Sequence, residues 1–317
     1  MNAAVIQAAS LCKRYGDRAA VTDATFEIRG GEVFGLLGPN GAGKTTTILM
    51  LLGLTEVSSG TIRVLDRDPQ RAPLQVKREV GYMPDAVGFY DALTARENLA
   101  FSAKLMGIPR SGRAGRIEAA LERVGLAGVG GNKVATFSRG MRQRLGLAEV
   151  IMKQARVAVL DEPTSGLDPQ AAEDFLTLIN DLRHDGVTVL LSSHMLEHMQ
   201  RICDRVALFH AGRIALLGSV DELARQVLGG HRYVNIEARA GQALQLLRGI
   251  EGVRQVEQAG EHRYRLLADR DVRSQAAHAI VSAGGELLRM DDDTPGLDVI
   301  YNRYFESAHT EEEHATT

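Results

Sequence analysis

The residues best suited to chemistry lie in a glycine-rich segment, Gly38–Thr46, which matches the pattern GxxxxGK[ST]. It follows an apolar run, Val33–Leu37, and opens a helical pattern. Glycines let successive backbone N–H groups surround an anion, and the helix N-terminus adds partial positive charge. We therefore expect a phosphate-binding loop, in which Lys44 contacts the β- and γ-phosphates of a nucleotide and the Thr45 hydroxyl ligates Mg²⁺. The positions expected to bind the nucleotide are Gly38, Asn40, Gly41, Gly43, Lys44, Thr45 and Thr46.

A pair of carboxylates, Asp161 and Glu162, ends a second apolar run, Val157–Leu160. A carboxylate at the C-terminal end of a strand beside a phosphate-binding loop can hold Mg²⁺ through water. We therefore predict that Asp161 binds the metal and that Glu162 is a base that polarises a water molecule in line with the γ-phosphate. The alternative is an ordinary acidic loop after a strand, and the phosphate-binding pattern earlier in the chain argues against it.

The elements that must position these residues alternate between short β-branched runs and longer helical patterns, as expected for an α/β fold with a buried sheet. Val33–Leu37, Val157–Leu160 and Val187–Leu191 are apolar throughout, which is typical of central parallel strands. Between the last two runs, Ala171–Asp185 carries one apolar helical stripe, and Gly186 follows as the helix stop. The pattern predicts a strand–helix–strand crossover.

Two further regions surround this predicted core. Phe26–Ile28 and Thr61–Val64 alternate apolar and polar residues, which indicates half-buried antiparallel strands. Residues from about Leu93 to Lys153 are mostly helical in pattern, with glycine-containing breaks. We therefore expect an antiparallel β subdomain and a helical subdomain beside the parallel sheet.

A smaller module is expected after the Gly229–Gly230 pair, which marks a hinge. Its pattern is βαββαβ-like, as in a ferredoxin-like α+β module, and a final amphipathic helix follows. The predicted boundaries are residues 1–228 for a nucleotide-binding domain, 229–305 for the module and 306–317 for a disordered acidic tail. We expect the module to provide a dimerisation or regulatory surface. Ligand sensing is the alternative, because fold alone does not assign function.

Composition excludes several other classes of protein. Of 317 residues, 44% are hydrophobic and 24% are charged, which fits neither a disordered nor a fibrous chain. A formal net charge of −3 gives no overall attraction to nucleic acid or to an anionic membrane. The two cysteines, Cys12 and Cys203, are too few for a disulfide framework and indicate a reducing compartment, although one pair stays possible. The N-terminus lacks the pattern of a signal peptide, and no apolar run approaches the roughly 20 residues of a membrane span.

Several motifs in this order resemble those of the ATP-binding cassette (ABC) family over about residues 5–228. Besides the phosphate-binding loop and the carboxylate pair, Phe137–Met141 is similar to the family signature LSGGQ, and Ser165–Asp168 looks like the family's D-loop. The resemblance implies a P-loop NTPase core, ATP and Mg²⁺ as cofactors, and two cassettes that sandwich two nucleotides.

The resemblance also assigns roles to single residues. Ser138 is expected to cap a helix and, with Gly140, to form a second anion site that closes on the γ-phosphate held by the opposite subunit. Asp168 would lie at the dimer seam. His194 is similar to the switch histidine, whose imidazole can donate a hydrogen bond to the γ-phosphate. Tyr15 fits the aromatic residue that stacks on adenine. Taken alone, these motifs would indicate a helix cap and a packing tyrosine.

Two positions depart from the family pattern. Asp85 stands where the family has the glutamine of its Q-loop, and a carboxylate there can still bind Mg²⁺ with a shorter reach and an added negative charge. The expected Mg²⁺ ligands are thus Thr45, Asp85 and Asp161. In the signature, Arg139 replaces the first glycine and Met141 replaces the glutamine. This pattern resembles the branch of drug and polysaccharide exporters that includes daunorubicin-resistance ATPases and the nitrous-oxide-reductase maturation ATPase.

Two other groups of residues suggest different chemistry. The first is a set of soft metal ligands on one helix face, namely His194, Met195, His198, Met199 and Cys203. A switch role for the first and packing for the others explain it better, because no carboxylate or cysteine cluster completes a site. The second is a basic run of Arg139, Arg142 and Arg144. A solvated helix face with some phosphate role is expected there rather than contact with DNA.

Together these features predict the ATP-hydrolysing subunit of an ABC transporter, and the signature favours an exporter. Nucleotide binding would close a cassette dimer and hydrolysis would reopen it, as a shift of populations. The expected partners are a second copy of the chain and a polytopic transmembrane permease, reached through grooves near Asp85–Phe101 and the helical region. The chain would then lie as a peripheral protein on the cytoplasmic face of the cell membrane. The cargo stays open between an antibiotic, a lipid, a polysaccharide and a factor for cofactor assembly.

Two alternatives come from other functional classes. A soluble ABC ATPase acting on ribosomes or DNA is disfavoured, because the chain carries one phosphate-binding loop, no sustained coiled-coil heptads and no basic excess. No nucleic-acid partner is therefore expected. A non-hydrolysing structural cassette is opposed by the presence of both Glu162 and His194.

Overall fold

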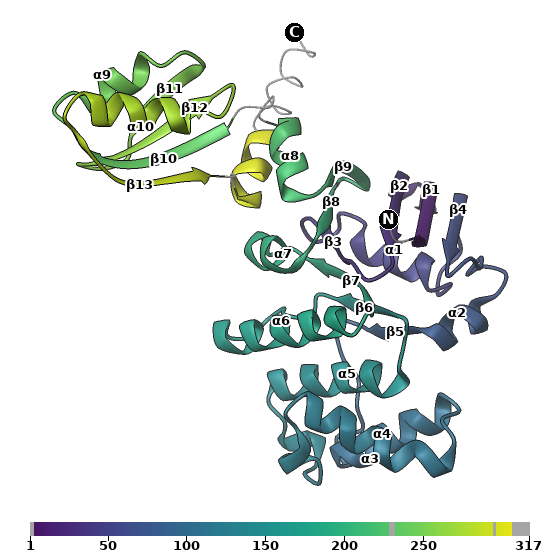
Figure 1. Ribbon diagram of the computed structural model, residues 1–317. Coiled ribbons are helices and arrows are strands. Elements are labelled where there is room, and N and C mark those ends of the chain that lie inside the picture. The colour runs from purple at the N-terminus through teal and green to yellow at the C-terminus, as the bar shows by residue number, and fades with distance from the viewer. Residues whose placement is uncertain (1–2, 228–231, 294–295, 306–317) are drawn as a thin grey trace. The chain divides into compact units, whose positions relative to one another are not determined.

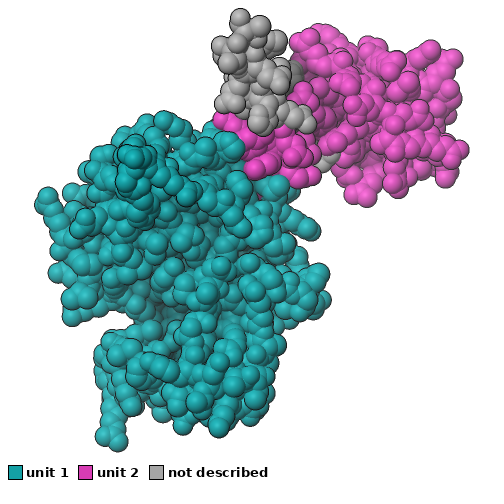
Figure 2. Space-filling view, turned by 180° about the vertical axis from the view of Figure 1, so that it is seen from behind, with its two compact units in different colours: residues 1–217 teal, residues 218–317 magenta. Residues whose placement is uncertain are grey.

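The computed structural model describes residues 3–227, 232–293 and 296–305, and the chain forms two compact units (Figures 1 and 2). Unit 1 covers residues 1–217 and unit 2 covers residues 218–317. This division places helix α8 (Val220–Val227) in unit 2, whereas the sequence pattern puts the boundary at residue 228, which stays a prediction. The Gly229–Gly230 pair and the predicted tail, 306–317, lie outside the described residues.

The central element of unit 1 is a six-stranded sheet with the order β5-β6-β7-β3-β8-β9. In that order, its strands are β5 (Val80–Met83), β6 (Val157–Asp161), β7 (Thr188–Ser193), β3 (Val33–Leu37), β8 (Arg205–His210) and β9 (Arg213–Gly218). The pairs from β5 through β8 are parallel, and β3 and β6 are buried along their whole length. The three predicted central strands are therefore confirmed. Their C-terminal ends meet at one edge of the sheet.

A second, antiparallel sheet has the order β2-β1-β4. Its strands are β1 (Ala4–Tyr15), β2 (Arg18–Arg29) and β4 (Ser59–Val64). The alternating pattern predicted parts of β2 and β4 but not β1. Helix α1 (Lys44–Leu51) packs against both sheets, and its Ile48, Met50 and Leu51 belong to a core shared with them. The helix that follows the phosphate-binding loop is thereby fixed between two layers.

The predicted helical region is confirmed as three packed helices. These are α3 (Ala95–Leu105), α4 (Arg110–Arg123) and α5 (Arg139–Lys153), with short 3₁₀ helices at Ala127–Val129 and Val134–Thr136. Helix α5 packs on β5 as well as on α3 and α4, so it joins the helical layer to the sheet (Figure 1). The remaining helices of unit 1 are α2 (Pro73–Glu79), α6 (Pro169–His184) and α7 (Leu196–Ile202). None of the described helices has the length and apolar character needed to cross a bilayer.

Unit 2 contains the predicted βαββαβ order. Its elements are β10 (Arg232–Arg239), α9 (Ala243–Arg248), β11 (Val253–Gln258), β12 (Arg263–Ala268), α10 (Arg273–Ser282) and β13 (Glu286–Asp293). The strands form one antiparallel sheet in the order β11-β12-β10-β13, which is the ferredoxin-like arrangement. Both helices contribute to its core, and a last helical stretch, 297–305, buries Leu297 and Ile300.

Candidate functional site

The glycine-rich segment forms a loop between the end of β3 and the start of α1, as the sequence pattern predicted. Gly38 has a φ of 151°, and a Cβ there would lie 2.3 Å from the carbonyl oxygen of Phe209. Gly43 has a φ of 107°, and a Cβ there would lie 2.7 Å from the carbonyl oxygen of Ala20. Only glycine fits at these two positions, so the loop conformation depends directly on the sequence.

The ammonium group of Lys44 is held across this loop, and its side chain is only 5% exposed. Its Nζ donates to the carbonyl oxygens of Gly38 at 2.5 Å and Pro39 at 3.3 Å. It also lies 3.1 Å from Oε1 of Glu162 at the end of β6. This Oε1 has no other hydrogen-bond partner among the described residues, so the ion pair is its compensation for burial.

Asp161 is buried beside the loop and accepts two hydrogen bonds at the same oxygen. The Ser192 hydroxyl donates to Oδ1 at 2.5 Å, and the Thr45 hydroxyl donates to Oδ1 at 3.2 Å. Burial raises the pKa of Asp161, and these hydrogen bonds from Ser192 and Thr45 act to lower it. A carboxylate and a hydroxyl this close are hard oxygen donors of the kind that Mg²⁺ prefers, so this pair fits the metal.

Glu162, at the end of β6, connects Lys44 of the phosphate-binding loop to residues at the end of β7. Its backbone φ of 47° is unusual for a residue with a side chain, and its N–H donates to the Ser192 hydroxyl oxygen at 3.0 Å. Its carboxylate Oε2 lies 2.9 Å from Nδ1 of His194, which follows β7, and the Glu162 side chain is only 12% exposed. Because β3, β6 and β7 are parallel neighbours, residues far apart in sequence meet at this edge.

A cavity of about 520 Å³ opens at the loop, and most predicted nucleotide-binding residues line it. The predicted residues that line the cavity are Tyr15, Asn40, Gly41, Gly43, Lys44, Thr45, Thr46, Asp85 and Glu162. The Tyr15 ring is half exposed, with Lys13 Nζ 4.8 Å from its centre, so it is not the packing tyrosine of the alternative interpretation. Asp85 is exposed after β5, and its carbonyl oxygen accepts from Gln143 Nε2 at 3.4 Å.

Two residues of this site were missed by sequence reasoning. Arg18 lines the cavity because it pairs with Tyr15 across the hairpin that joins β1 to β2. Ser192 connects Asp161 and Glu162 because it stands opposite Asp161 in the parallel ladder. The only signals in the sequence were the nearness of Arg18 to Tyr15 and a hydroxyl at the end of an apolar run.

Six predicted residues do not line this cavity. Gly38, Asp161 and His194 are joined to lining residues by the contacts given above, whereas Ser138, Gly140 and Asp168 lie elsewhere. The Ser138 hydroxyl caps α5 by accepting from the N–H of Met141 at 3.2 Å, and the Asp168 carboxylate caps α6 by accepting from the N–H of Ala171 at 2.9 Å. A Cβ at Gly140 would lie 3.7 Å from Ala171 Cβ. The N-termini of α5 and α6 are therefore neighbours, forming a second surface apart from the cavity.

The other conspicuous side chains of the sequence have structural partners. Met199 and Cys203 pack against Gly35 of β3, and both cysteines are free thiols. His198 Nδ1 lies 3.0 Å from the Thr164 hydroxyl, and burial lowers the pKa of this histidine. The basic run is mostly paired, since Arg142 binds Asp91 and Arg144 binds Asp174, each at 2.8 Å.

A parallel sheet with a GxxxxGK[ST] loop and a carboxylate pair on a nearby strand defines a P-loop ATPase. The ABC transporter family model matches residues 21–165. The chain is 35% identical over 232 residues to the linearmycin resistance ATP-binding protein LnrL of Bacillus subtilis (strain 168), covering 73% of this chain and 74% of that protein. It is 38% identical over 211 residues to the bacitracin transport ATP-binding protein BcrA of Bacillus licheniformis, covering 66% and 68%.

A solved ATP-binding subunit of an ABC transporter has a similar fold. It superposes with a TM-score of 0.64 at 31% identity, covering 70% of this chain and 92% of that one. The chain therefore belongs to the ABC transporter family and is an ATP-binding, ATP-hydrolysing subunit of that family.

The bond from Ser192 to Asp161 gives a pH prediction. That hydrogen bond favours the ionised carboxylate, so Ser192→Ala is expected to raise the pKa of Asp161 further above its usual range. Because the protonated form cannot hold a cation, the acid limb of the ATP hydrolysis profile should move to higher pH. The measurement is turnover against pH at saturating ATP and Mg²⁺.

Ser193→Ala is the matched control, since the hydroxyl of Ser193 is also buried on β7 but accepts from the N–H of Met195 instead. The acid limb of the pH profile of this variant should lie at the same pH as that of the wild type. An unchanged acid limb in Ser192→Ala would contradict the assignment of Asp161 as the titrating group.

Proposed function

We propose that this chain hydrolyses Mg²⁺-ATP in the cavity at the phosphate-binding loop and thereby energises export through a separate transmembrane subunit. The observation that carries the proposal is the carboxylate of Glu162. It lies 3.1 Å from Lys44 Nζ and 2.9 Å from His194 Nδ1, beside the pair formed by Thr45 and Asp161. A base, a cation and a hydrogen-bonding imidazole thus converge where three parallel strands end.

In this proposal the loop and its lysine bind the phosphates. The backbone N–H groups of Gly41–Thr46 surround the β-phosphate, and Lys44 exchanges its contacts with loop carbonyls for phosphate oxygens. Thr45 and Asp161 would hold Mg²⁺, which would supply positive charge beside the phosphates. Tyr15 stacks on the adenine, and the exposed Arg18 adds positive charge at the same rim.

Glu162 acts as the general base on the attacking water. Once Lys44 turns to the phosphates, the carboxylate is free to accept a proton, and His194 fixes its orientation through Oε2. The buried surroundings of Glu162 strengthen these electrostatic interactions. Asp85 lies at the cavity rim, where a glutamine would be neutral, so its charge is expected to favour binding with Mg²⁺ over binding of free ATP.

The surface formed by Ser138, Gly140 and Asp168 supports a dimer. Within one chain this surface is not part of the cavity, although the N-terminus of α5 carries an anion-binding hydroxyl and N–H groups. A second copy, related by two-fold symmetry, would bring its α5 N-terminus to the γ-phosphate held here. Each nucleotide site would then contain residues of both chains.

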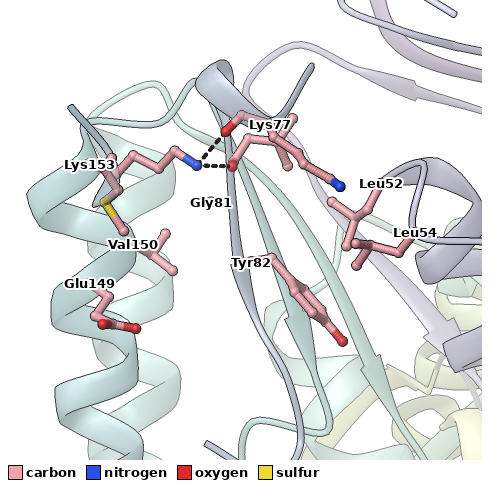
Figure 3. A pocket seen from close by; sticks show the side chains of 10 residues that line it. Leu52, Leu54, Lys77, Gly81, Tyr82, Glu149, Val150 and Lys153 are labelled. Carbon is pink, nitrogen blue, oxygen red and sulfur yellow. Dashed lines mark hydrogen bonds between the residues drawn. The ribbon is translucent and has the colours of Figure 1, made fainter. Parts of the chain in front are cut away.

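An apolar groove on unit 1 supports docking of a transmembrane subunit. One cavity, of about 280 Å³, lies between α5 and β5 and is lined by Leu52, Leu54, Tyr82 and Val150, among others (Figure 3). An adjoining cavity shares Lys77, Met106 and Lys153 with it and adds Leu74, Leu105 and Ile108. Leu54, Leu74, Leu105 and Met106 are large apolar residues with exposed side chains. Such grouping on one face is typical of a protein interface.

The charges around this groove suggest the chemistry of its occupant. The cations Lys77, Arg78, Arg116 and Lys153 line the two cavities, and the one carboxylate is Glu149. Lys153 donates to the carbonyl oxygens of Lys77 and Val80 (Figure 3). The Ser102 hydroxyl donates to Glu149. An amphipathic helix with an apolar face and flanking acidic residues fits this pattern.

The groove and the nucleotide cavity are joined by one strand. Gly81 and Tyr82 of β5 line the groove, and Asp85, three residues after Tyr82, lines the nucleotide cavity. A shift of this short strand would affect both sites at once. No residue of the expected segment Asp85–Phe101 lines the groove, whose lining includes residues of β5, α5 and the rest of the helical region instead.

Export as the direction of transport is supported by the relatives. One is named for linearmycin resistance and another for bacitracin transport, and the Ser138–Arg144 pattern resembles the exporter branch. Since the cargo contacts would lie on the transmembrane subunit, no cargo is assigned to this chain.

The catalytic assignment predicts the effect of two substitutions. Lys44→Ala and Glu162→Gln should each lower ATP turnover at least about 100-fold, since the first removes a phosphate contact and the second removes the base. Glu162→Gln should keep its affinity for ATP, measured by equilibrium binding, because the amide can still bond to His194.

Glu118→Gln is the control, as its carboxylate is exposed on α4 and binds Arg96. This variant should hydrolyse ATP like the wild type. Wild-type turnover in Glu162→Gln would refute the assignment of Glu162 as the base.

The docking proposal predicts a loss of partner binding in Leu105→Asp. Leu105 is 74% exposed beside the groove, so the substitution adds a charge without disturbing the core. We expect at least about tenfold less copurification with the proposed transmembrane subunit, and unchanged ATPase activity of the isolated chain.

Leu288→Asp is the matched control, because Leu288 is 43% exposed on β13 in unit 2. It should copurify like the wild type. The docking site would be wrong if Leu105→Asp bound the membrane protein normally.

A further inference from the structure

We propose that Arg139 is a positioning residue that couples the segment Phe137–Met141 to the segment Glu162–Asp168 of the same chain. This inference rests on the proposed function, because the first segment would serve the partner's nucleotide and the second this chain's own. Arg139 would thus link the two nucleotide sites of the dimer. Arg139 stands where the family signature has its first glycine.

The contact is between the guanidinium of Arg139 and the backbone of Gly166. A Cβ built on Gly166 would lie 2.7 Å from Cζ, 2.8 Å from Nη1 and 3.0 Å from Nε of Arg139. Three atoms of the planar group at such similar distances mean that its face covers the glycine. Gly166 has a φ of 67°, so its backbone conformation favours glycine, and a side chain there would displace the guanidinium of Arg139.

Arg139 is exposed, and the contact of its guanidinium with Gly166 does not depend on an opposite charge. No described carboxylate forms an ion pair with Arg139, whereas the neighbouring Arg142 and Arg144 each bind an aspartate. Lysine lacks a flat group and could not cover the glycine in the same way. The contact with Gly166 therefore depends on the planar shape of the guanidinium and not on its charge alone.

The covered glycine is tied closely to the proposed base. The N–H of Ser165 donates to the carbonyl oxygen of Glu162 at 3.1 Å, and the N–H of Leu167 donates to that of Thr164 at 3.3 Å. Two overlapping hydrogen-bonded turns, Glu162–Ser165 and Thr164–Leu167, thus connect Gly166 to Glu162. His198 holds Thr164 from the other side, at 3.0 Å. A displacement of Gly166 would therefore be passed to the backbone of Glu162.

The other end of the link is the N-terminus of α5. Arg139 is the first residue of this helix and directly follows Ser138, whose hydroxyl caps it. Gly140 faces Leu167 and Ala171, with a Cβ position 3.8 and 3.7 Å from their side chains. The signature segment cannot move toward a partner's phosphate without carrying Arg139, and hence the turn at Gly166, with it.

The test compares two substitutions that break the contact. Arg139→Ala removes the guanidinium, and Gly166→Ala puts a methyl group where the guanidinium lies. Both are expected to lower kcat about fivefold, to bring the Hill coefficient for ATP down to 1, and to leave KM within about twofold of the wild type. Arg139→Lys should behave like Arg139→Ala, because it keeps the charge and loses the plane.

Arg144→Ala is the matched control. Arg144 also reaches from α5 to α6, where it binds Asp174 at 2.8 Å, but it does not touch the turn at Gly166. This variant should lower the melting temperature while keeping the wild-type kcat and Hill coefficient. A role of Arg139 in packing alone would give the same result for both arginines.

Three results would overturn the inference. They are wild-type kcat and cooperativity in Arg139→Ala, equal kinetic losses in Arg139→Ala and Arg144→Ala, and full rescue by Arg139→Lys. In each of these cases the wild-type chain still hydrolyses ATP, so only the inference about Arg139 would fall and the proposed function would stand. If the wild-type chain itself lacked ATP turnover, both proposals would fall together.

Discussion

The ion pair between Lys44 and Glu162 is the interaction on which the rest of the site depends. Both side chains are nearly buried, at 5% and 12% exposure, and an unpaired charge there would be strongly unfavourable. The phosphate-binding loop and the end of β6 must therefore stay together. The parallel sheet secures this, because β7 lies between β3 and β6 and supplies Ser192, which binds both carboxylate residues. A nucleotide that draws Lys44 toward its phosphates would leave the Glu162 carboxylate available to water.

Tyr82 shows how the nucleotide cavity and the apolar groove are electrically connected. It lines the groove on β5, yet burial and then the charges of Asp161 and Asp85 raise the pKa of its phenol to about 12. Tyr82 thus lies within electrostatic range of the carboxylates of the nucleotide site while its ring lines the groove.

Local patterns in the sequence predicted the three central strands β3, β6 and β7, the phosphate-binding loop and most residues of the cavity, but not β1, β5, β8 or β9. The loop pattern Gly38–Thr46 requires its own backbone conformation, and apolar runs predict buried strands without knowledge of their neighbours. Tertiary pairing could not be predicted in this way. Ser192 reaches both carboxylate residues because it pairs with Asp161 in the parallel ladder. The contact of Arg139 with Gly166 joins residues 27 positions apart in sequence. The division between the units also depends on packing, which places α8 with unit 2.

The central claim is that one nucleotide site contains residues of two chains, and a paired-variant experiment tests it most directly. Lys44→Ala disables a chain's own phosphate site, whereas Ser138→Asp keeps the cap of α5 but repels a partner's phosphate. Coexpressed with different tags and purified through both, these two chains should form a heterodimer with one intact site. We predict ATP turnover well above that of either variant alone and at most about half that of the wild type, because one of the two sites is intact. A heterodimer as inactive as its parents would contradict the account.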